Sequence, residues 1–391
     1  ENMLKLTGRT TPELDITRDG RTDTLYGDIH FYLPPGTRFH ESVPDAASPG
    51  TTSLNAVHTT TEPLFVSMTF EKGDCTMLTR RQNTITEALF DTVGEPLVNT
   101  DANQTDDIRR LGLKYEYNLY RTACRLYPQK PSAGFELLRF GRVISTEHET
   151  LTPADAPLWR TVSFPGGTGM VNLASPDIKK FSDADFPHWT GWRMVDDDTD
   201  NNSQCNSPLI AGLQDSGHFS DLSSRLVCHF SLEWNAATFD QRYAWLKAGS
   251  DDVPAMSEED YERLKSHASA LCFNTGEHGT GRLWHVHPQT FITHFRRCCW
   301  LSKSELKQLI PRNALRTAGR NDYRWEAINN YRDGTGSVAD NIRTHMNRTM
   351  QKHLITTPLR IACFLGNGIQ ETGWLGSMEE GYRYTETDTH T

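Results

Sequence analysis

A chain of 391 residues has room for two or three domains of ordinary size, and a hydrophobic share of 36%, with nine Trp and seventeen Phe, suffices for real cores. The formal net charge of −10 argues against a general nucleic-acid binder and against a polybasic membrane-surface protein, because both need a basic surface. No stretch approaches the roughly 18 uninterrupted apolar residues of a membrane-spanning helix, so no membrane span is expected.

The N-terminal half has the pattern of a β-rich module. A short apolar run over 28–33 stops at Pro34-Pro35-Gly36. The run over 64–70 alternates between apolar and polar residues and precedes a turn at Lys72-Gly73-Asp74, which predicts a hairpin. Ser, Thr, Pro and Ala dominate 43–62, which predicts a long loop there.

A helix is predicted over 115–126, and short strands are predicted over 137–140, 159–162 and 170–173. The turn at Pro165-Gly166-Gly167 separates the last two strands. Short strands joined by tight turns favour a small barrel.

An acidic, turn-forming stretch over 196–202 indicates a boundary, and helical signals dominate after it. Thr238 and Gln241 have the spacing of a capping box, in which each side chain bonds a free backbone N–H of the first helical turn. Ser257 is a second candidate N-cap, ahead of an amphipathic stretch.

Three further helices are predicted after residue 301. The first begins with a capping box of Ser302 and Glu305, and Pro311 ends it. Ser337 caps the second. The third begins at Thr357-Pro358, with proline in the tolerated first position, and its buried face is formed by Ile361, Leu365 and Ile369.

Two carboxylates follow one another at the end of this third helix, Glu371 and Glu380. In one continuous helix their nine-residue separation is about 13.5 Å, with the side chains on opposite faces. Glycosidases need two carboxyl groups about 5–5.5 Å apart for retention or about 6.5–9.5 Å apart for inversion. The spacing is therefore usable only if the chain turns back, which Gly373 and Gly376 permit.

The segment 357–366, followed by Gln370-Glu371-Thr372-Gly373, resembles the catalytic helix of glycoside hydrolase family 19-like endolysins and chitinases. In that family a second acid arrives nine residues after the first, where Glu380 stands. The segment 301–311 is similar to the family's entry helix. Two residues depart from the pattern, because Gln370 replaces the usual His and Trp374 stands where a second Gly is common.

A larger part of the chain resembles type VI secretion effectors that carry such a lysozyme-like domain at their C-terminus. The similarity lies in 181–189, 284–292, 295–298 and 300–302. It implies an antibacterial protein that a type VI apparatus delivers into the periplasm of a target cell. Its partners would be peptidoglycan, delivery proteins and an immunity protein.

The resemblance also implies the chemistry, which is cleavage of the β-1,4 bond between N-acetylmuramic acid and N-acetylglucosamine without a cofactor. Glu371 would be the general acid, with a pKa raised by partial burial, and Glu380 would be the base that activates water. Thr372, Trp374 and Tyr384 would contact the sugar.

The family's domain continues well beyond the second acid, whereas this chain ends eleven residues after Glu380. The polar start at Glu1, which lacks the basic and apolar parts of an export signal, likewise suggests a fragment of a longer protein. A non-catalytic, wall-binding fragment is therefore one alternative. An N-acetylmuramoyl-L-alanine amidase is the other, to which His30, His40 and His58 would belong.

The expected architecture is α+β. Residues 1–190 form a β-rich part that resembles Src-homology-3-like modules, which hold cell-wall peptide or position a catalytic domain. Residues 191–300 form the acidic boundary loop and a helical linker domain. Residues 301–391 form the N-terminal half of a lysozyme-like domain.

Two groups of residues have some features of metal sites, one for calcium and one for zinc. Asp196, Asp198 and Asp200 resemble the opening of a calcium loop, but Asn201 and Ser207 do not fit its later positions, so a solvated acidic turn is favoured. A second group, His285 and His287 with the cysteines at 298 and 299, has no standard zinc spacing, so a histidine packed beside Trp284 is favoured. The eight cysteines include no CxxC pair and are expected to be mostly reduced core thiols.

Overall fold

The computed structural model describes residues 25–44, 56–85, 89–104, 114–144, 149–199, 202–272, 282–297, 301–309, 312–327 and 338–372. It combines helices with mainly antiparallel sheets, so the predicted α+β class is confirmed. The chain divides into two compact units, one containing Ile29–Thr293 and the other containing Leu25–Asp28 and His294 onward. The domain limits at 190 and 300, the Src-homology-3-like module and the lysozyme-like domain stay predictions.

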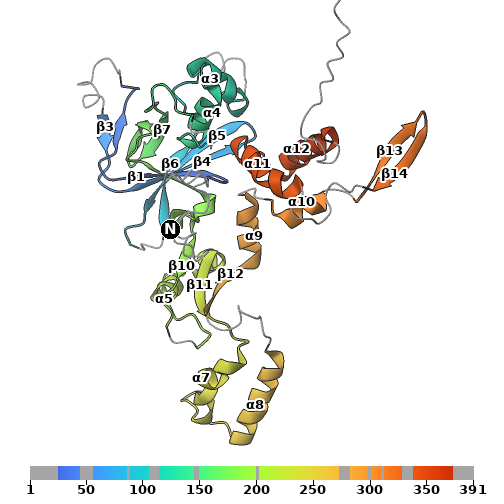
Figure 1. Ribbon diagram of the computed structural model, residues 1–391. Coiled ribbons are helices and arrows are strands. Elements are labelled where there is room, and N and C mark those ends of the chain that lie inside the picture. Colours follow the sequence, from blue (N-terminus) through green and yellow to red (C-terminus); the bar gives the residue numbers. More distant parts are fainter. Residues whose placement is uncertain are drawn as a thin grey trace, which may run out of the picture. The chain divides into compact units, whose positions relative to one another are not determined.

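The first sheet of the first unit is antiparallel, with the strand order β6-β5-β4-β1-β9 (Figure 1). Its strands are β1 (Ile29–Leu33), β4 (Leu64–Glu71), β5 (Asp74–Gln82), β6 (Phe90–Val98) and β9 (Lys179–Ser182). Lys72 and Gly73 form the β4–β5 turn with positive φ angles of 53° and 90°, so the predicted hairpin is confirmed. The side chains of Phe31, Val66 and Met68 share one face of this sheet and are fully buried.

The second sheet has the order β3-β2-β8-β7, made of β2 (Arg38–His40), β3 (Ala56–Thr59), β7 (Trp159–Phe164) and β8 (Gly167–Asn172). The two strands predicted around the 165–167 turn are confirmed. The loop predicted over 43–62 is wrong at β3, where Phe39 pairs with His58 across the sheet. A bridge between Asp101 and Arg160 links this sheet to the end of β6.

Two helices follow β6, namely α3 (Leu119–Leu126), which a short 3₁₀ turn η1 (Glu116–Asn118) precedes, and α4 (Pro131–Phe140). The helix predicted over 115–126 is confirmed. The strand predicted over 137–140 is wrong, because these residues are the last turn of α4. Pro131 starts that helix and Gly141 ends it in a left-handed conformation with φ 73°.

The rest of the first unit contains a three-stranded sheet and short helices. Strand β10 (Arg193–Val195) runs parallel to β11 (Leu226–Ser231), which pairs antiparallel with β12 (Arg282–Val286). The α-helices are α5 (Pro208–Asp215), α6 (Phe219–Leu222), α7 (Phe239–Tyr243) and α8 (Glu258–Leu271), and the 3₁₀ turns are η2 (Asp183–Asp185), η3 (His188–Thr190), η4 (Ser223–Arg225), η5 (Ala236–Thr238) and η6 (Ala244–Lys247). Helix α9 (Pro288–Arg297) begins in the first unit and ends in the second.

Two capping predictions in this region have opposite outcomes. Ser257 caps α8, because its hydroxyl accepts the Asp260 N–H at 3.2 Å. The capping box at Thr238 is wrong, because a 3₁₀ turn precedes α7 and Asn235 caps that turn through the Ala237 N–H. Thr238 instead donates its hydroxyl to the Asn235 carbonyl at 3.2 Å.

The second unit contains α10 (Lys303–Leu309), a hairpin of β13 (Asn313–Gly319) and β14 (Asp322–Ala327), α11 (Val338–Lys352) and α12 (Pro358–Glu371). The Ser302–Glu305 capping box is confirmed, with hydrogen bonds of 2.9 and 3.2 Å. Thr357 caps α12 as predicted, and Ala314 packs with Leu365 and Ile369. Pro311 and Ser337 lie outside the described residues.

The β13–β14 hairpin of the second unit was not predicted from the sequence.

The described helices include none with the length and hydropathy needed to cross a membrane. Six of the cysteines are described and are free thiols, as predicted. Their predicted core position is correct for Cys75 and Cys228, but Cys205 and Cys272 are half-buried and Cys124 and Cys363 are exposed.

Candidate functional site

The predicted catalytic acid, Glu371, is the last residue of α12, and its side chain is exposed rather than partly buried. The next residue, Thr372, donates its hydroxyl to the Gly368 carbonyl at 2.6 Å, and its N–H donates to the same carbonyl at 3.1 Å. Glu380, Trp374 and Tyr384 lie outside the described residues, so the carboxylate pair stays a prediction.

A groove of about 680 Å³ runs along another side of α12 within the second unit. Its apolar lining comes from Leu301, Ile361, Leu365 and Ile369, and polar groups are supplied by Arg296, Glu305 and Gln370. Glu371 is not among the lining residues. At 3.6 residues per turn it lies about 80° around α12 from Ile361 and about 120° from Leu365, outside the arc that the lining residues cover. The groove and the predicted acid are therefore separate features.

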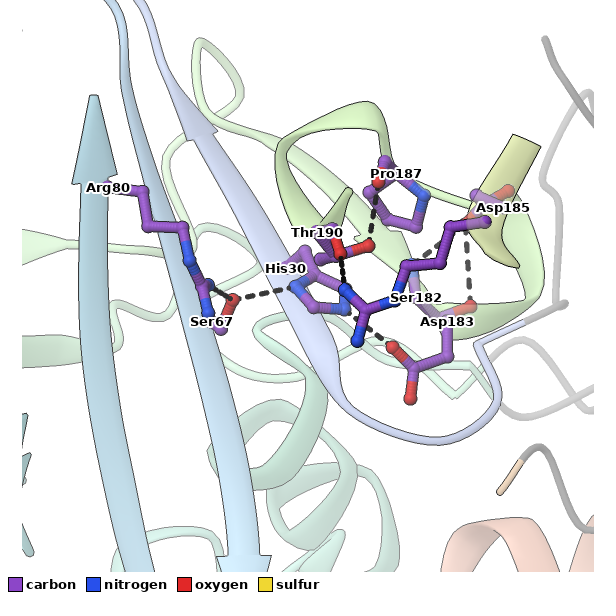
Figure 2. Close-up of polar contacts among 9 residues, drawn as sticks. His30, Ser67, Arg80, Ser182, Asp183, Asp185, Pro187 and Thr190 are labelled. Atoms are coloured by element: carbon purple, nitrogen blue, oxygen red, sulfur yellow. Dashed lines mark hydrogen bonds and ion pairs between the residues drawn. The ribbon is translucent and has the colours of Figure 1, made fainter. Parts of the chain in front are cut away.

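A histidine, a serine and an aspartate meet inside the first unit (Figure 2). His30 Nδ1 lies 2.9 Å from Ser67 Oγ, and His30 Nε2 lies 2.8 Å from Asp183 Oδ1. His30 is separated by 37 positions from Ser67 and by 153 positions from Asp183, so no short sequence motif predicts the arrangement. All three are buried, with exposed fractions of 2%, 6% and 6% for His30, Ser67 and Asp183.

Strand register brings the cluster together. His30 of β1 lies directly opposite Ser67 of β4 on one side and Phe181 of β9 on the other. Asp183 follows β9 in η2, whose capping box includes a 2.7 Å hydrogen bond from the Ser182 N–H to Asp185 Oδ2. Burial raises the pKa of Asp185, against the opposing effect of this hydrogen bond.

The hydrogen bonds have one direction along the cluster. Arg80 can only donate, and its Nη1 gives a 3.0 Å hydrogen bond to Ser67 Oγ. The Ser67 proton is then available to His30 Nδ1, and in the tautomer that accepts it His30 Nε2 donates to Asp183. The same order, from serine through histidine to aspartate, occurs in serine hydrolases.

Two features prevent this cluster from acting as a hydrolase site. A serine nucleophile needs backbone N–H groups beside it that are free to bind an oxyanion, but Ser67 lies in mid-strand, paired with both β1 and β5. The burial of all three side chains also excludes a substrate from the Ser67 hydroxyl. The cluster is suited to holding β1, β4 and η2 together.

The 181–189 segment packs over the same cluster. Trp189 stacks on Phe65 at 4.7 Å, and its ring lies edge-on to His30 at 6.1 Å. Burial beside Phe65 and Trp189, and secondarily the charge of Arg193, lower the pKa of His188 to about 4. His188 is therefore neutral near pH 7.

A second groove, of about 720 Å³, lies in the first unit between the 34–37 turn, β2, β7 and the 175–179 segment. Arg38, Asp177 and Lys179 line it, and all three are exposed. Among the described residues none of these three side chains forms a hydrogen bond or an ion pair. Trp159 forms an aromatic wall, with His40 edge-on to it at 5.6 Å. Burial, and then the Arg38 charge, lower the pKa of His40.

The acidic turn is held by protein groups. Asp196 accepts a 2.9 Å hydrogen bond from His229 Nδ1, Asp197 accepts one of 3.0 Å from Ser207, and Asp198 is buried. Asp200 lies outside the described residues. No three His, Cys, Asp or Glu side chains in the described parts of the chain are grouped so that they can hold a metal ion.

Most of the histidines singled out in the sequence contact an aromatic ring, and His287 contacts Thr290 instead. His285 stacks on Phe230 at 3.8 Å, while Trp284 stacks on His229 at 4.4 Å. His287 accepts a hydrogen bond from the Thr290 N–H at 3.3 Å, and Cys298 and Cys299 lie outside the described residues. His58 stacks on Phe164 at 4.2 Å, so the three histidines considered for an amidase have different neighbours.

Comparison with models of protein families, with curated proteins and with solved structures finds no match to this chain.

Proposed function

We propose that the chain belongs to a peptidoglycan hydrolase that cleaves the β-1,4 bond between N-acetylmuramic acid and N-acetylglucosamine. Its destination is the periplasm of a target bacterium, reached through a type VI apparatus, and its residues 301–391 are the N-terminal half of a lysozyme-like domain. The motif around Glu371 is the main support. The local structure agrees with that motif, because α12 begins at the Thr357 cap, ends at Glu371 and leaves that carboxyl accessible.

In this proposal Glu371 protonates the glycosidic oxygen, and Glu380 removes a proton from the water that attacks the sugar from the opposite face. The product is then inverted at the anomeric carbon. The reaction requires the chain to turn back after Glu371, and Gly373 is the second residue beyond the end of α12.

The test is incubation of the purified chain with peptidoglycan, with released muropeptides identified by mass spectrometry. Glu371→Gln is expected to lower release by about 10²–10⁴-fold, which is the usual contribution of a general acid. Glu259→Gln, at an exposed position on α8, is the matched control and is expected to retain full release. Circular dichroism checks that both variants fold.

Three results would contradict this assignment. Equal release by the wild type and Glu371→Gln removes Glu371 from the reaction. Products cut at the lactyl-amide bond identify an amidase. An inactive wild-type chain, beside an active longer one, identifies a fragment that does not catalyse alone.

Wall binding by the β-rich part is a second candidate function, which we propose because of the free charges in the 720 Å³ groove. Two Src-homology-3-like features support it, namely short antiparallel strands and tight turns. Arg38→Ala with Lys179→Ala is expected to lower co-sedimentation with peptidoglycan, whereas Arg121→Ala, at an exposed position on α3, is not. Unchanged co-sedimentation of the double variant would remove the groove from wall binding.

A further inference from the structure

Two cysteines of the first unit are neighbours, Cys205 in the segment that leads to α5 and Cys228 on β11. Both belong to one apolar cluster, in which Cys228 is buried with Val195, Leu213 and Leu226 while Cys205 packs against it half-buried. Neither thiol has a part in the proposed hydrolysis.

Strand register and two hydrogen bonds fix this contact. Val195 of β10 lies directly opposite Cys228 of β11, so the aspartates that follow Val195 leave the sheet beside Cys228. The residues after Cys205 are tied back to those aspartates. The Asn206 N–H donates to Asp198 at 3.4 Å, and the Ser207 hydroxyl donates to Asp197 at 3.0 Å. These two hydrogen bonds, made by the residues that follow Cys205, hold Cys205 beside Cys228.

We propose that Cys205 and Cys228 form a disulfide when the protein meets a disulfide oxidant, such as oxidised glutathione or an oxidising thiol–disulfide enzyme. The Cys205 thiolate attacks the oxidant's disulfide, forms a mixed disulfide and expels one thiolate. The Cys228 sulfur then attacks Cys205, forms the internal bond and expels the second thiolate. Each cysteine loses one proton and one electron, and the oxidant is reduced to two thiols.

The environment of the pair sets the rate of this reaction. Burial raises the pKa of Cys205, and burial followed by the adjacent Cys205 thiol raises that of Cys228 to about 12. Since the thiolate is the attacking species, oxidation is slow at neutral pH and accelerates as the pH rises. The half-buried Cys205 is the thiol that an oxidant reaches first.

The product would close the loop from Cys205 to Cys228, which contains α5, α6 and η4. A loop of this length stabilises a protein mainly by restricting its unfolded chain. We expect oxidation to raise the Tm of the first unit by about 5 °C.

The experiment treats the full chain with oxidised glutathione at pH 8 and then alkylates the remaining thiols. Mass spectrometry of the proteolytic peptides is expected to show Cys205 joined to Cys228, with two hydrogens fewer and no glutathione attached. Cys205→Ser is expected to lose this linked peptide and the rise in Tm. Cys124→Ser, at an exposed position on α3, is expected to keep both.

Three outcomes overturn the proposal: both cysteines fully alkylated after oxidation, a glutathione that stays on Cys205, or a linked peptide that joins either cysteine to another partner. The wild-type chain alone gives these readouts, so a Cys205→Ser variant that fails to fold does not weaken the test. The result is also independent of the proposed hydrolysis, because no glycan is present.

Discussion

Replacement of Asp183 by Ala is expected to lower the free energy of unfolding of the first unit by about 2–3 kcal/mol. Asp183 accepts a 2.8 Å hydrogen bond from His30, and a buried hydrogen bond to a charged group contributes about 1.5–3 kcal/mol. His30 is 2% exposed, so no water can replace the lost carboxylate, and its Nε2–H is left buried without a partner.

A graded series separates the parts of this effect. Asp183→Asn keeps a carbonyl oxygen as the acceptor and is expected to cost about 1 kcal/mol, as is Ser67→Ala, which removes one neutral hydrogen bond. Urea unfolding followed by tryptophan fluorescence is a suitable assay, because Trp189 lies 6.1 Å from the His30 ring. With a slope of about 2–3 kcal/mol per molar urea, Asp183→Ala is expected to move the midpoint by about 1 M.

Activity decides between structural and catalytic roles. If the cluster only holds the sheet, Ser67→Ala retains muropeptide release while Asp183→Ala unfolds early. A wild-type midpoint for Asp183→Ala, together with a complete loss of hydrolysis in Ser67→Ala, would refute the reasoning and identify Ser67 as a nucleophile.

Three further predictions concern charge. The folded protein holds the pKa of His188 at about 4, below its usual 6.5, so as the pH falls the unfolded chain protonates this histidine before the folded chain does. The free energy of unfolding is therefore expected to fall as the pH drops from about 6.5 to 4. The urea midpoint of His188→Gln should depend less on pH in that window. The hydrogen bond from the Ser302 N–H lowers the pKa of Glu305. The Glu305 carboxylate therefore stabilises α10 at pH values above its usual pKa of 4.5, and this stabilisation is lost as the pH falls through the lower pKa of the folded protein. Glu305→Gln should weaken hydrogen-exchange protection of α10 at pH 7. Arg139→Met removes the guanidinium that lies 2.9 Å from the buried Glu116 carboxylate and is expected to cost about 3–5 kcal/mol in urea unfolding. A second change, Glu116→Gln, should restore part of this loss.

Features with a local cause were predictable from the sequence. A cap depends on residues about three positions apart, so Ser257, the Ser302–Glu305 pair and Thr357 were identified correctly. The Thr238–Gln241 pair has the same spacing but failed, because a 3₁₀ turn capped by Asn235 precedes α7. The β4–β5 hairpin was predictable for the same reason, because its turn and its alternation lie within one short stretch.

Features decided by distant packing were not predictable. The error at 137–140 is an exception, because Leu137, Leu138 and Phe140 suit a strand or a helix equally and the local signals of α4, Pro131 at its start and Gly141 at its end, were overlooked. The β13–β14 hairpin exposes nearly all its side chains, Trp325 by 73%, so burial imposes no alternation on its sequence. The His30 cluster depends on the register of β1 against two strands.

The candidate site divides in the same way. The position of Glu371 at a helix end followed from the local signals that begin and end α12. Whether Glu380 faces it depends on the path of the chain through Gly373 and beyond, which a local pattern does not determine.

The position of β9 has a consequence for how the protein is made. Strand β9, the neighbour of β1 on one side, leaves the ribosome roughly 150 residues after β1. Until then one edge of β1 offers its N–H and C=O groups to any strand that approaches. Nascent chains that stop before β9 are thus the species most exposed to aggregation, and a chaperone that covers β1 during translation would have the greatest effect on yield.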